Sequence, residues 1–153
     1  MGDLDACLAM DRDPAVTRFI SGPWTDPVAH RGFVEARIRH PYPSGMGYWL
    51  IGAPDFAGWI LLTPLDLAGP EIEIGWRLVR AAWGKGYATE AARPVLDHAL
   101  RPLRVPEVIA DIDPDNAASV AVARKIGLNP AGTMPYAGRT VTRYVSAPGG
   151  ARP

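Results

Sequence analysis

Polar and apolar positions alternate strictly between residues 71 and 79, as they do in a β-strand with one buried face. One face of this strand carries Glu71, Glu73, Gly75 and Arg77. The opposite face carries Ile72, Ile74, Trp76 and Leu78. The apolar face therefore belongs to the core, and the polar face is either solvated or functional.

The same kind of periodicity predicts the other elements of the fold. Strands at 48–51 and 56–63, separated by turns rich in Gly, Pro and Asp, form an antiparallel meander with the strand at 71–79. The remaining expected elements are helices at 3–10, 27–40, 88–100 and 116–126, and strands at 107–113, 129–136 and 140–145. The pattern predicts an α+β fold with a mixed, mostly antiparallel sheet flanked by helices.

The helix expected at 27–40 has an apolar stripe and a charged face. The stripe consists of Val28, Phe33, Val34 and Ile38, and the charged residues outside it are Arg31, Glu35 and Arg39. Charges at this spacing typically form i,i+4 pairs in water. The alternative is that the charged face forms a wall for an acceptor substrate.

Pro94 lies inside the helix expected at 88–100, where a proline removes one backbone hydrogen bond and costs about 3 kcal/mol. We therefore expect a kink or a break near Arg93. The apolar residues beyond the proline keep helical spacing, which predicts that the helix resumes.

Two glycines, Gly84 and Gly86, follow the strand at 71–79 and precede that helix. Glycine permits a tight turn, and backbone N–H groups at the positive end of a helix form a site for an anion such as phosphate. Two common phosphate-binding motifs do not fit this turn. A Walker loop needs a glycine where Val79 stands, and the dinucleotide fingerprint needs a third glycine where Thr89 stands.

Composition restricts the class of protein further. The chain of 153 residues suits one domain, which we place at 1–146, followed by a flexible tail at 147–153. The 16 basic and 16 acidic residues cancel, so a small molecule or peptide is a better partner than nucleic acid. A single cysteine, Cys7, and the lack of a signal peptide or a run of about 20 apolar residues predict a cytoplasmic protein without a membrane span.

The glycine turn and its surroundings resemble the GNAT superfamily of acetyl-CoA-dependent N-acetyltransferases. The family's loop has Gln or Arg, two variable residues, Gly, one variable residue, and then Gly or Ala. The present loop matches at Gly86 and Ala88 and departs at the first position, where Trp83 stands. The resemblance spans 48–145. Within it the chain is similar to the branch that acetylates ribosomal-protein N-termini, through the segments Glu73-Ile-Gly-Trp-Arg, Asp115-Asn-Ala-Ala-Ser and Arg124-Lys-Ile-Gly-Leu.

This resemblance implies that the central strands, at 71–79 and 107–113, splay around the pantetheine arm of acetyl-CoA, with the pyrophosphate on the glycine turn. It also implies direct transfer of acetyl to a primary amine in a ternary complex. The implied cofactor-binding residues are Trp83, Gly84, Lys85, Gly86, Tyr87, Ala88, Thr89, Asn116 and Ser119. For the side chains of Trp83 and Tyr87 alone, we favour packing in the core.

Relatives usually open with a strand before the first helix, whereas this chain enters the helix directly. Either the given sequence starts downstream of the native start, or the sheet lacks that first strand. In the second case the exposed strand edge could pair with a second copy, so a homodimer is a further expectation.

Acetyl transfer needs a base, because an alkyl ammonium has a pKa of about 10 in water. Glu73 is the expected base, since the family often places a glutamate there, and Glu71 on the same face is the alternative. Both carboxylates could instead simply face solvent. Ser119 is expected to donate a hydrogen bond to the departing thiolate, because Ala123 stands where many relatives have a tyrosine.

Two residues near Ser119 also have local structural interpretations. Asn116 is a preferred helix N-cap residue, and this role is compatible with contact to the pantetheine arm. Gly127 is predicted to end the same helix with a positive φ, followed by an apolar contact from Leu128.

The three histidines have no partners at metal-ligand spacing, so we expect no metal. A second hypothesis is a non-catalytic acyl-CoA-binding protein on the same fold, which would need neither Glu73 nor Ser119. In relatives the segment around residues 24–42 forms the acceptor side, and its cationic balance indicates a carboxylate-bearing or acidic acceptor. Its candidate residues are Trp24, His30, Arg31, Arg37, His40 and Tyr42.

Overall fold

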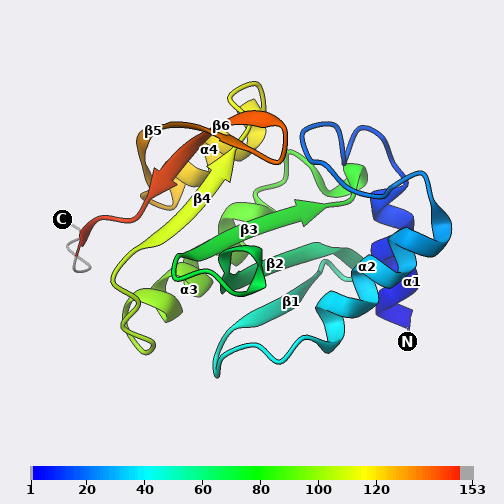
Figure 1. The fold of residues 1–153 in the computed structure, drawn as a ribbon, viewed down its shortest axis with the longest axis horizontal. Coiled ribbons are helices and arrows are strands. Elements are labelled where there is room, and N and C mark those ends of the chain that lie inside the picture. The colour runs from blue at the N-terminus through cyan, green and yellow to red at the C-terminus, as the bar shows by residue number, and fades with distance from the viewer. Residues whose placement is uncertain (1, 149–153) are drawn as a thin grey trace.

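The computed structural model describes residues 2–148, so positions 149–153 of the expected tail lie outside the described residues. Its sheet has the strand order β1-β2-β3-β4-β6-β5 (Figure 1). The strands are β1 (Gly47–Gly52), β2 (Phe56–Pro64), β3 (Ile72–Leu78), β4 (Val108–Ile112), β5 (Asn129–Tyr136) and β6 (Arg139–Val145). The helices are α1 (Gly2–Asp11), α2 (Pro27–Arg39), α3 (Tyr87–Leu100) and α4 (Ala117–Lys125). The predicted α+β class and order of elements are confirmed.

The sheet is mixed, as predicted, because β3 and β4 run parallel whereas the other neighbouring strands in the described chain run antiparallel. The parallel pairing is short and joins Ile72 to Val108 and Glu73 to Ile109. Beyond Glu73 the two strands separate, and Figure 1 shows them parting toward their carboxyl ends. The expected splay of the central strands is therefore present, and Glu73 lies where it begins.

The core lies on the apolar face of the sheet, where α3 and α4 pack. Alternate residues of β3 point there as predicted, with Ile74 and Leu78 buried. The cluster also takes residues from the other central strands and from both helices, including Leu62, Leu96, Ala99, Val108, Ala123, Ile126 and Tyr144. The polar face of β3 points to the opposite side of the sheet, where α1, α2 and the loops lie.

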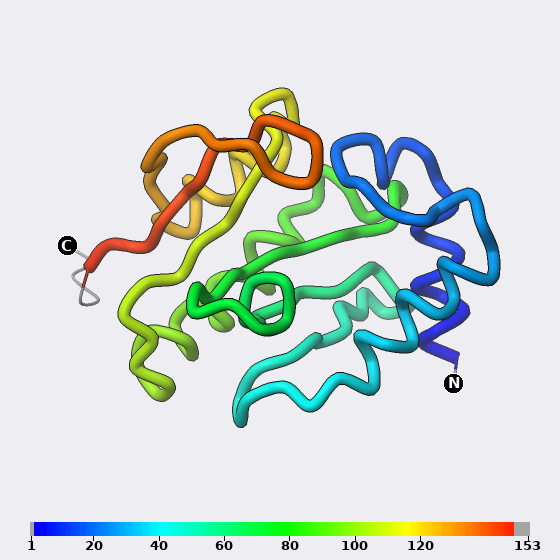
Figure 2. Tube along the Cα trace, viewed as in Figure 1, coloured from blue at the N-terminus to red at the C-terminus, as the bar shows by residue number. Residues whose placement is uncertain are grey.

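The long loop between α1 and α2 lies beside the β5–β6 hairpin, although more than a hundred residues separate them in sequence (Figure 2). The hydroxyl of Ser21 donates to the carbonyl of Ala137 at the tip of the hairpin, at 3.3 Å. Arg139 in β6 donates to the carbonyl of Arg18, also at 3.3 Å. These contacts close the polar face at the carboxyl end of β4.

The predicted apolar stripe of α2 is wrong at both ends, because Val28 is 84% exposed and Ile38 is 60% exposed. The face that turns inward instead carries His30, Phe33, Val34 and Arg37, at i, i+3, i+4 and i+7 spacing. Hydrophobicity alone misplaced this face because its most buried residue, His30, is polar and is satisfied by a partner in α1. The predicted i,i+4 pairs do form, since Glu35 lies 3.8 Å from Arg31 and 3.9 Å from Arg39.

Of the kink or break expected near Arg93, the break does not occur, because α3 runs continuously from Tyr87 to Leu100. Pro94 lies on the exposed side of the helix, where water can satisfy the carbonyl that loses its backbone partner. The buried side carries Ala92, Leu96 and Ala99, whose packing holds the helix across the proline. The expected helix end at Gly127 is confirmed by its φ of 95°, and Leu128 behind it is buried.

Candidate active site

The glycine turn connects β3 to α3 at the open end of the splay. Gly84 and Gly86 both adopt left-handed φ values, of 71° and 81° respectively. Gly86 is the N-cap of α3 and supplies no side chain to bond the N–H groups of the first turn. A Cβ atom built on either glycine would meet no atom within 4 Å, so the space above the turn is open. These features leave the positive end of α3 accessible to an anion.

The two aromatic side chains of the turn behave differently. Tyr87 packs, partly buried, against a small cluster formed by Ala57, Leu78 and Ala82, which confirms the core interpretation for this residue. For Trp83 that interpretation is wrong, because the side chain is 48% exposed. Its indole N–H donates to the carbonyl of Leu78 at 3.0 Å. This bond holds the ring on the surface beside the turn.

The residues present fit an acetyl-CoA molecule. The exposed turn at Gly84 and Gly86 offers backbone N–H groups to a pyrophosphate. Beyond Glu73, β3 has no register partner in β4, so its backbone groups on that side are free to bond the amides of a pantetheine arm. Asn116 and Ser119 begin α4 on the other side of the splay.

Asn116 and Ser119 form the predicted helix cap. The side-chain oxygen of Asn116 accepts a hydrogen bond from the backbone N–H of Ser119 at 3.2 Å. This bond uses the backbone of Ser119 and leaves its hydroxyl for other partners. Ala123, one turn further along, is fully buried and carries no group for proton transfer.

Glu73 lies at the base of the splay, opposite Thr63 of β2 and Ile109 of β4. Burial, together with the nearby carboxylates of Asp111 and Asp66, raises the pKa of its carboxyl group to about 7, and Arg37 and Arg143 oppose the rise. Within residues 2–148 the side chain of Glu73 makes no hydrogen bond or ion pair. Glu73 is thus a partly buried group that can exchange a proton near neutral pH, and not a solvent-facing carboxylate.

The alternative base, Glu71, has a different environment. Its side chain is 43% exposed and lies 3.5 Å from the guanidinium group of Arg143. Arg143 also donates two hydrogen bonds to the buried carboxylate of Asp111, at 2.8 and 2.7 Å. Glu71 and Asp111 are therefore both partnered, and Glu73 is the better candidate for a base.

Two further residues beside Glu73 were not predicted. The hydroxyl of Tyr136, at the end of β5, donates to the carboxylate of Asp66 at 2.6 Å. Burial and this carboxylate raise the pKa of Tyr136 above its ordinary value. Asp66 lies in the turn before β3, with a left-handed φ of 51°. No sequence pattern connects these two residues, which are 70 positions apart.

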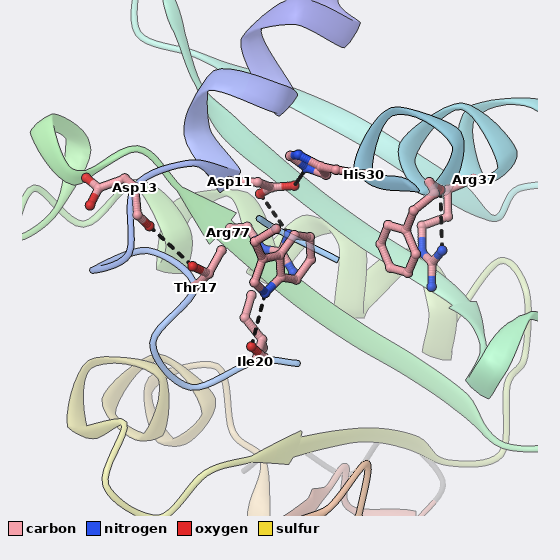
Figure 3. Close-up of polar contacts among 9 residues, drawn as sticks. Asp11, Asp13, Thr17, Ile20, His30, Arg37 and Arg77 are labelled. Carbon is pink, nitrogen blue, oxygen red and sulfur yellow. Dashed lines mark hydrogen bonds and ion pairs between the residues drawn. The ribbon is translucent and has the colours of Figure 1, made fainter. Parts of the chain in front are cut away.

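A buried ionic cluster holds α1 and α2 against the polar face of β3 (Figure 3). Asp11 of α1, with a side chain 3% exposed, lies 3.1 Å from the imidazole of His30 and 2.8 Å from the guanidinium group of Arg77. The same guanidinium group also stacks between the rings of Trp24 and Trp59. His30 is thus committed to a structural contact and is unavailable to an acceptor.

Within residues 2–148, no group of three or more His, Cys, Asp or Glu residues is placed to hold a metal ion. No helix in this part of the chain is long and apolar enough to span a bilayer.

The structure is an α+β protein with an open mixed sheet whose two central strands separate. A carboxyl group of raised pKa lies where the separation begins, and a glycine-capped helix starts beyond the other end of β3. The chain belongs to the GNAT acetyltransferase family, because the sequence model of the Acetyltransferase (GNAT) domain matches residues 1–129.

Curated relatives and solved structures agree with this assignment. The protein YkkB of Bacillus subtilis is 34% identical over 76% of this chain and 70% of its own length. The FsC-acetyl coenzyme A-N(2)-transacetylase of Aspergillus fumigatus is 30% identical over 79% of this chain, which spans 56% of that protein. An acetyltransferase structure from Agrobacterium tumefaciens is 27% identical, with a TM-score of 0.78, covering 96% of this chain and 86% of that chain.

A ribosomal-protein acetyltransferase is among the solved structures that share this fold. RimL, a ribosomal L7/L12 alpha-N-protein acetyltransferase solved with coenzyme A, has a TM-score of 0.73 over 94% of this chain and 88% of its own. At 20% identity, this likeness shows the shared fold.

Proposed function

We propose that this protein transfers the acetyl group of acetyl-CoA directly to a primary amine in a ternary complex. The observation that carries the proposal is Glu73, a partly buried carboxyl group with a pKa of about 7 at the base of the splay. A carboxyl group with this pKa is about half ionised at neutral pH, and its ionised form can take a proton from an ammonium group. The similarity to the Aspergillus acetyl coenzyme A-N(2)-transacetylase supports the same activity.

The proposed reaction assigns a role to each part of the site. Glu73 accepts one proton from the ammonium group, and the neutral nitrogen then forms a bond to the thioester carbonyl carbon. As the carbon–sulfur bond breaks, the nitrogen loses its second proton and the departing thiolate takes it up, which gives the amide and the free coenzyme A thiol. The departing thiolate has a pKa of about 8.5, so it leaves without a strong acid. Trp83, Gly84, Lys85, Gly86, Tyr87, Ala88 and Thr89 would hold the pyrophosphate end, and Asn116 and Ser119 the pantetheine end.

The test is release of free coenzyme A thiol from acetyl-CoA in the presence of single amines. The acceptors are amino acids, polyamines, aminoglycosides and peptides with free N-termini. Thiol release that depends on one class, with the acetylated amine identified by mass, is the expected result. Thermal stabilisation by coenzyme A without turnover of any amine would instead identify a non-catalytic acyl-CoA-binding protein.

Replacing Ser119 with alanine is expected to lower kcat by about 3- to 10-fold, because its hydroxyl only assists a thiolate that is already a fair leaving group. Thermal stability should not change, since the helix cap uses the backbone N–H of Ser119. Steady-state kinetics on the variant checks both statements. An unchanged kcat would remove Ser119 from the catalytic residues.

A further inference from the structure

Arg37 is the arginine of α2 that turns toward the sheet. It shares the inward face of the helix with His30 and Phe33 and is partly buried. Its guanidinium carbon lies 3.5 Å from the centre of the Phe33 ring, and one nitrogen donates to the carbonyl of Phe33 at 3.4 Å (Figure 3). Stacking on Phe33 orients the planar guanidinium group and leaves most of its five N–H donors unused.

The other arginines near this site already have carboxylate partners. Arg31 and Arg39 pair with Glu35 on the outer face of α2. In the sheet and the following turn, Arg77, Arg80, Arg139 and Arg143 pair with Asp11, Asp13, Asp113 and Asp111 respectively. Arg37 forms no ion pair with any residue between 2 and 148. A partly buried guanidinium group without a counter-charge is suited to bind a carboxylate from outside the chain.

Arg37 also lies over the surface that holds Glu73. The hydroxyl of Tyr42 donates to the carbonyl of Arg37 at 2.8 Å, and the Tyr42 ring lies 6.0 Å from that of Tyr48. Tyr48 pairs with Leu61 in β2, and Leu61 pairs with Gly75 in β3. Gly75 is on the same face of β3 as Glu73, two residues away, so the end of α2 lies on the side of the sheet that carries Glu73. The charge of Arg37 is near enough to lower the pKa of the Glu73 carboxyl group.

The remaining acids of this surface are occupied. Arg143 neutralises Asp111 and Glu71, and Tyr136 donates to Asp66. Within residues 2–148, Glu73 and Arg37 are therefore the charged side chains of this surface that form neither an ion pair nor a hydrogen bond to another side chain. Glu73 suits an amine, and Arg37 suits an anion.

We propose that Arg37 binds the carboxylate of an acceptor whose amine is presented to Glu73, so that the acceptor class is free amino acids. This inference rests on the proposed acetyl transfer and adds the acceptor class. Recognition of the carboxylate makes Arg37 the specificity-determining residue. Acceptors in which the carboxylate has become a neutral carboxamide should lose this contact.

The experiment compares each of the common amino acids with its own carboxamide, using the wild-type protein, Arg37→Gln and Arg39→Gln. For the amino acid that is acetylated fastest, we expect kcat/KM to exceed that of its carboxamide by at least about 10-fold, mostly through KM. Arg37→Gln should abolish this preference without changing KM for acetyl-CoA. Arg39→Gln is the matched control, since Arg39 is an arginine of the same helix with a side chain 78% exposed, and it should keep the preference.

A second measurement does not require turnover. Calorimetric titration of the protein–coenzyme A complex should show tighter binding of the N-acetyl amino acid than of its carboxamide. Arg37→Gln should remove this difference in affinity. Equal kcat/KM or equal binding for acid and carboxamide in the wild type would overturn the role of Arg37 while leaving acetyl transfer intact. Failure of every amine to release thiol, with coenzyme A still bound, would instead overturn the proposed function. Unfolding temperatures of the variants within about 3 °C of the wild type exclude misfolding as the cause.

Discussion

Replacing Glu73 with glutamine is expected to lower kcat by at least about 100-fold while affinity for coenzyme A stays within about twofold. General bases contribute roughly 10²- to 10⁴-fold to enzyme rates, and glutamine has nearly the same shape without a basic group. Steady-state kinetics with the best acceptor, together with calorimetry for coenzyme A, measures both quantities. Glu71→Gln is the matched control on the same strand, and its kcat should remain within about threefold, because Glu71 is half-exposed and paired with Arg143.

The rate of the wild-type protein should also depend on pH. Because the pKa of Glu73 is raised to about 7 and the base must be ionised, kcat/KM should rise with pH through about 7 and then level off. In Glu73→Gln this rise should disappear from the residual activity. A full rate in Glu73→Gln, or a rise centred near pH 4.5, would rule out Glu73 as the base.

The same substitution should stabilise the fold. The folded protein binds the Glu73 proton more tightly than the unfolded chain does, so the contribution of Glu73 to stability falls as pH rises from about 4.5 to about 7. Glutamine carries no such penalty. Denaturant unfolding should therefore show Glu73→Gln no more stable than the wild type near pH 4.5, and more stable at pH 8 by on the order of 2 kcal/mol. This opposition between stability and activity is typical of functional residues.

Gly86→Asp is expected to weaken coenzyme A binding by at least about 100-fold. The introduced carboxylate would accept the free N–H groups at the start of α3 and repel a pyrophosphate from the same position. Fluorescence or calorimetric titration with coenzyme A measures the change.

Gly138→Asp is the control for backbone strain in this experiment. Gly138 has a φ of 76°, close to the 81° of Gly86, and open space around it, but it lies in the β5–β6 turn and is not the N-cap of a helix. Both substitutions should cost similar stability, of about 1 kcal/mol, because both place a side chain at positive φ. A folded Gly86→Asp protein that binds coenzyme A like the control would show that the turn is not the pyrophosphate site.

Much of the fold follows from local pattern. The alternation in β3 predicted both its boundaries and its buried face, because strand periodicity depends on neighbouring residues alone. The glycine turn was predictable for the same reason, since positive φ and a helix start are local properties. The order of elements around it then confirmed the expected mixed sheet.

The sequence-based predictions failed, or were incomplete, for features that depend on tertiary contacts. The inward face of α2 could not be read from hydrophobicity, because its buried residue His30 depends on Asp11, which lies 19 positions earlier. The raised pKa of Glu73 depends on burial and on Asp66 and Asp111, which come from separate elements. The side chain of Trp83 was expected to pack in the core, whereas one hydrogen bond to the carbonyl of Leu78 holds it at the surface. The sequence predicted Glu73 as the candidate base, but the surroundings that raise its pKa are formed only when the sheet has assembled.

The short parallel junction between β3 and β4 leaves the sheet as two halves, one built from β1 to β3 and the other from β4 to β6. With two residue pairs at the junction, backbone bonding contributes little to joining them. The halves are held by α3, whose Ala92, Leu96 and Ala99 pack in one cluster with Ile74 of the first half and Val108 of the second. The packing of α3 therefore joins the two halves of the sheet. A ligand bound at the start of this helix would stabilise the junction between the halves, and with it the whole domain, and not only the glycine turn.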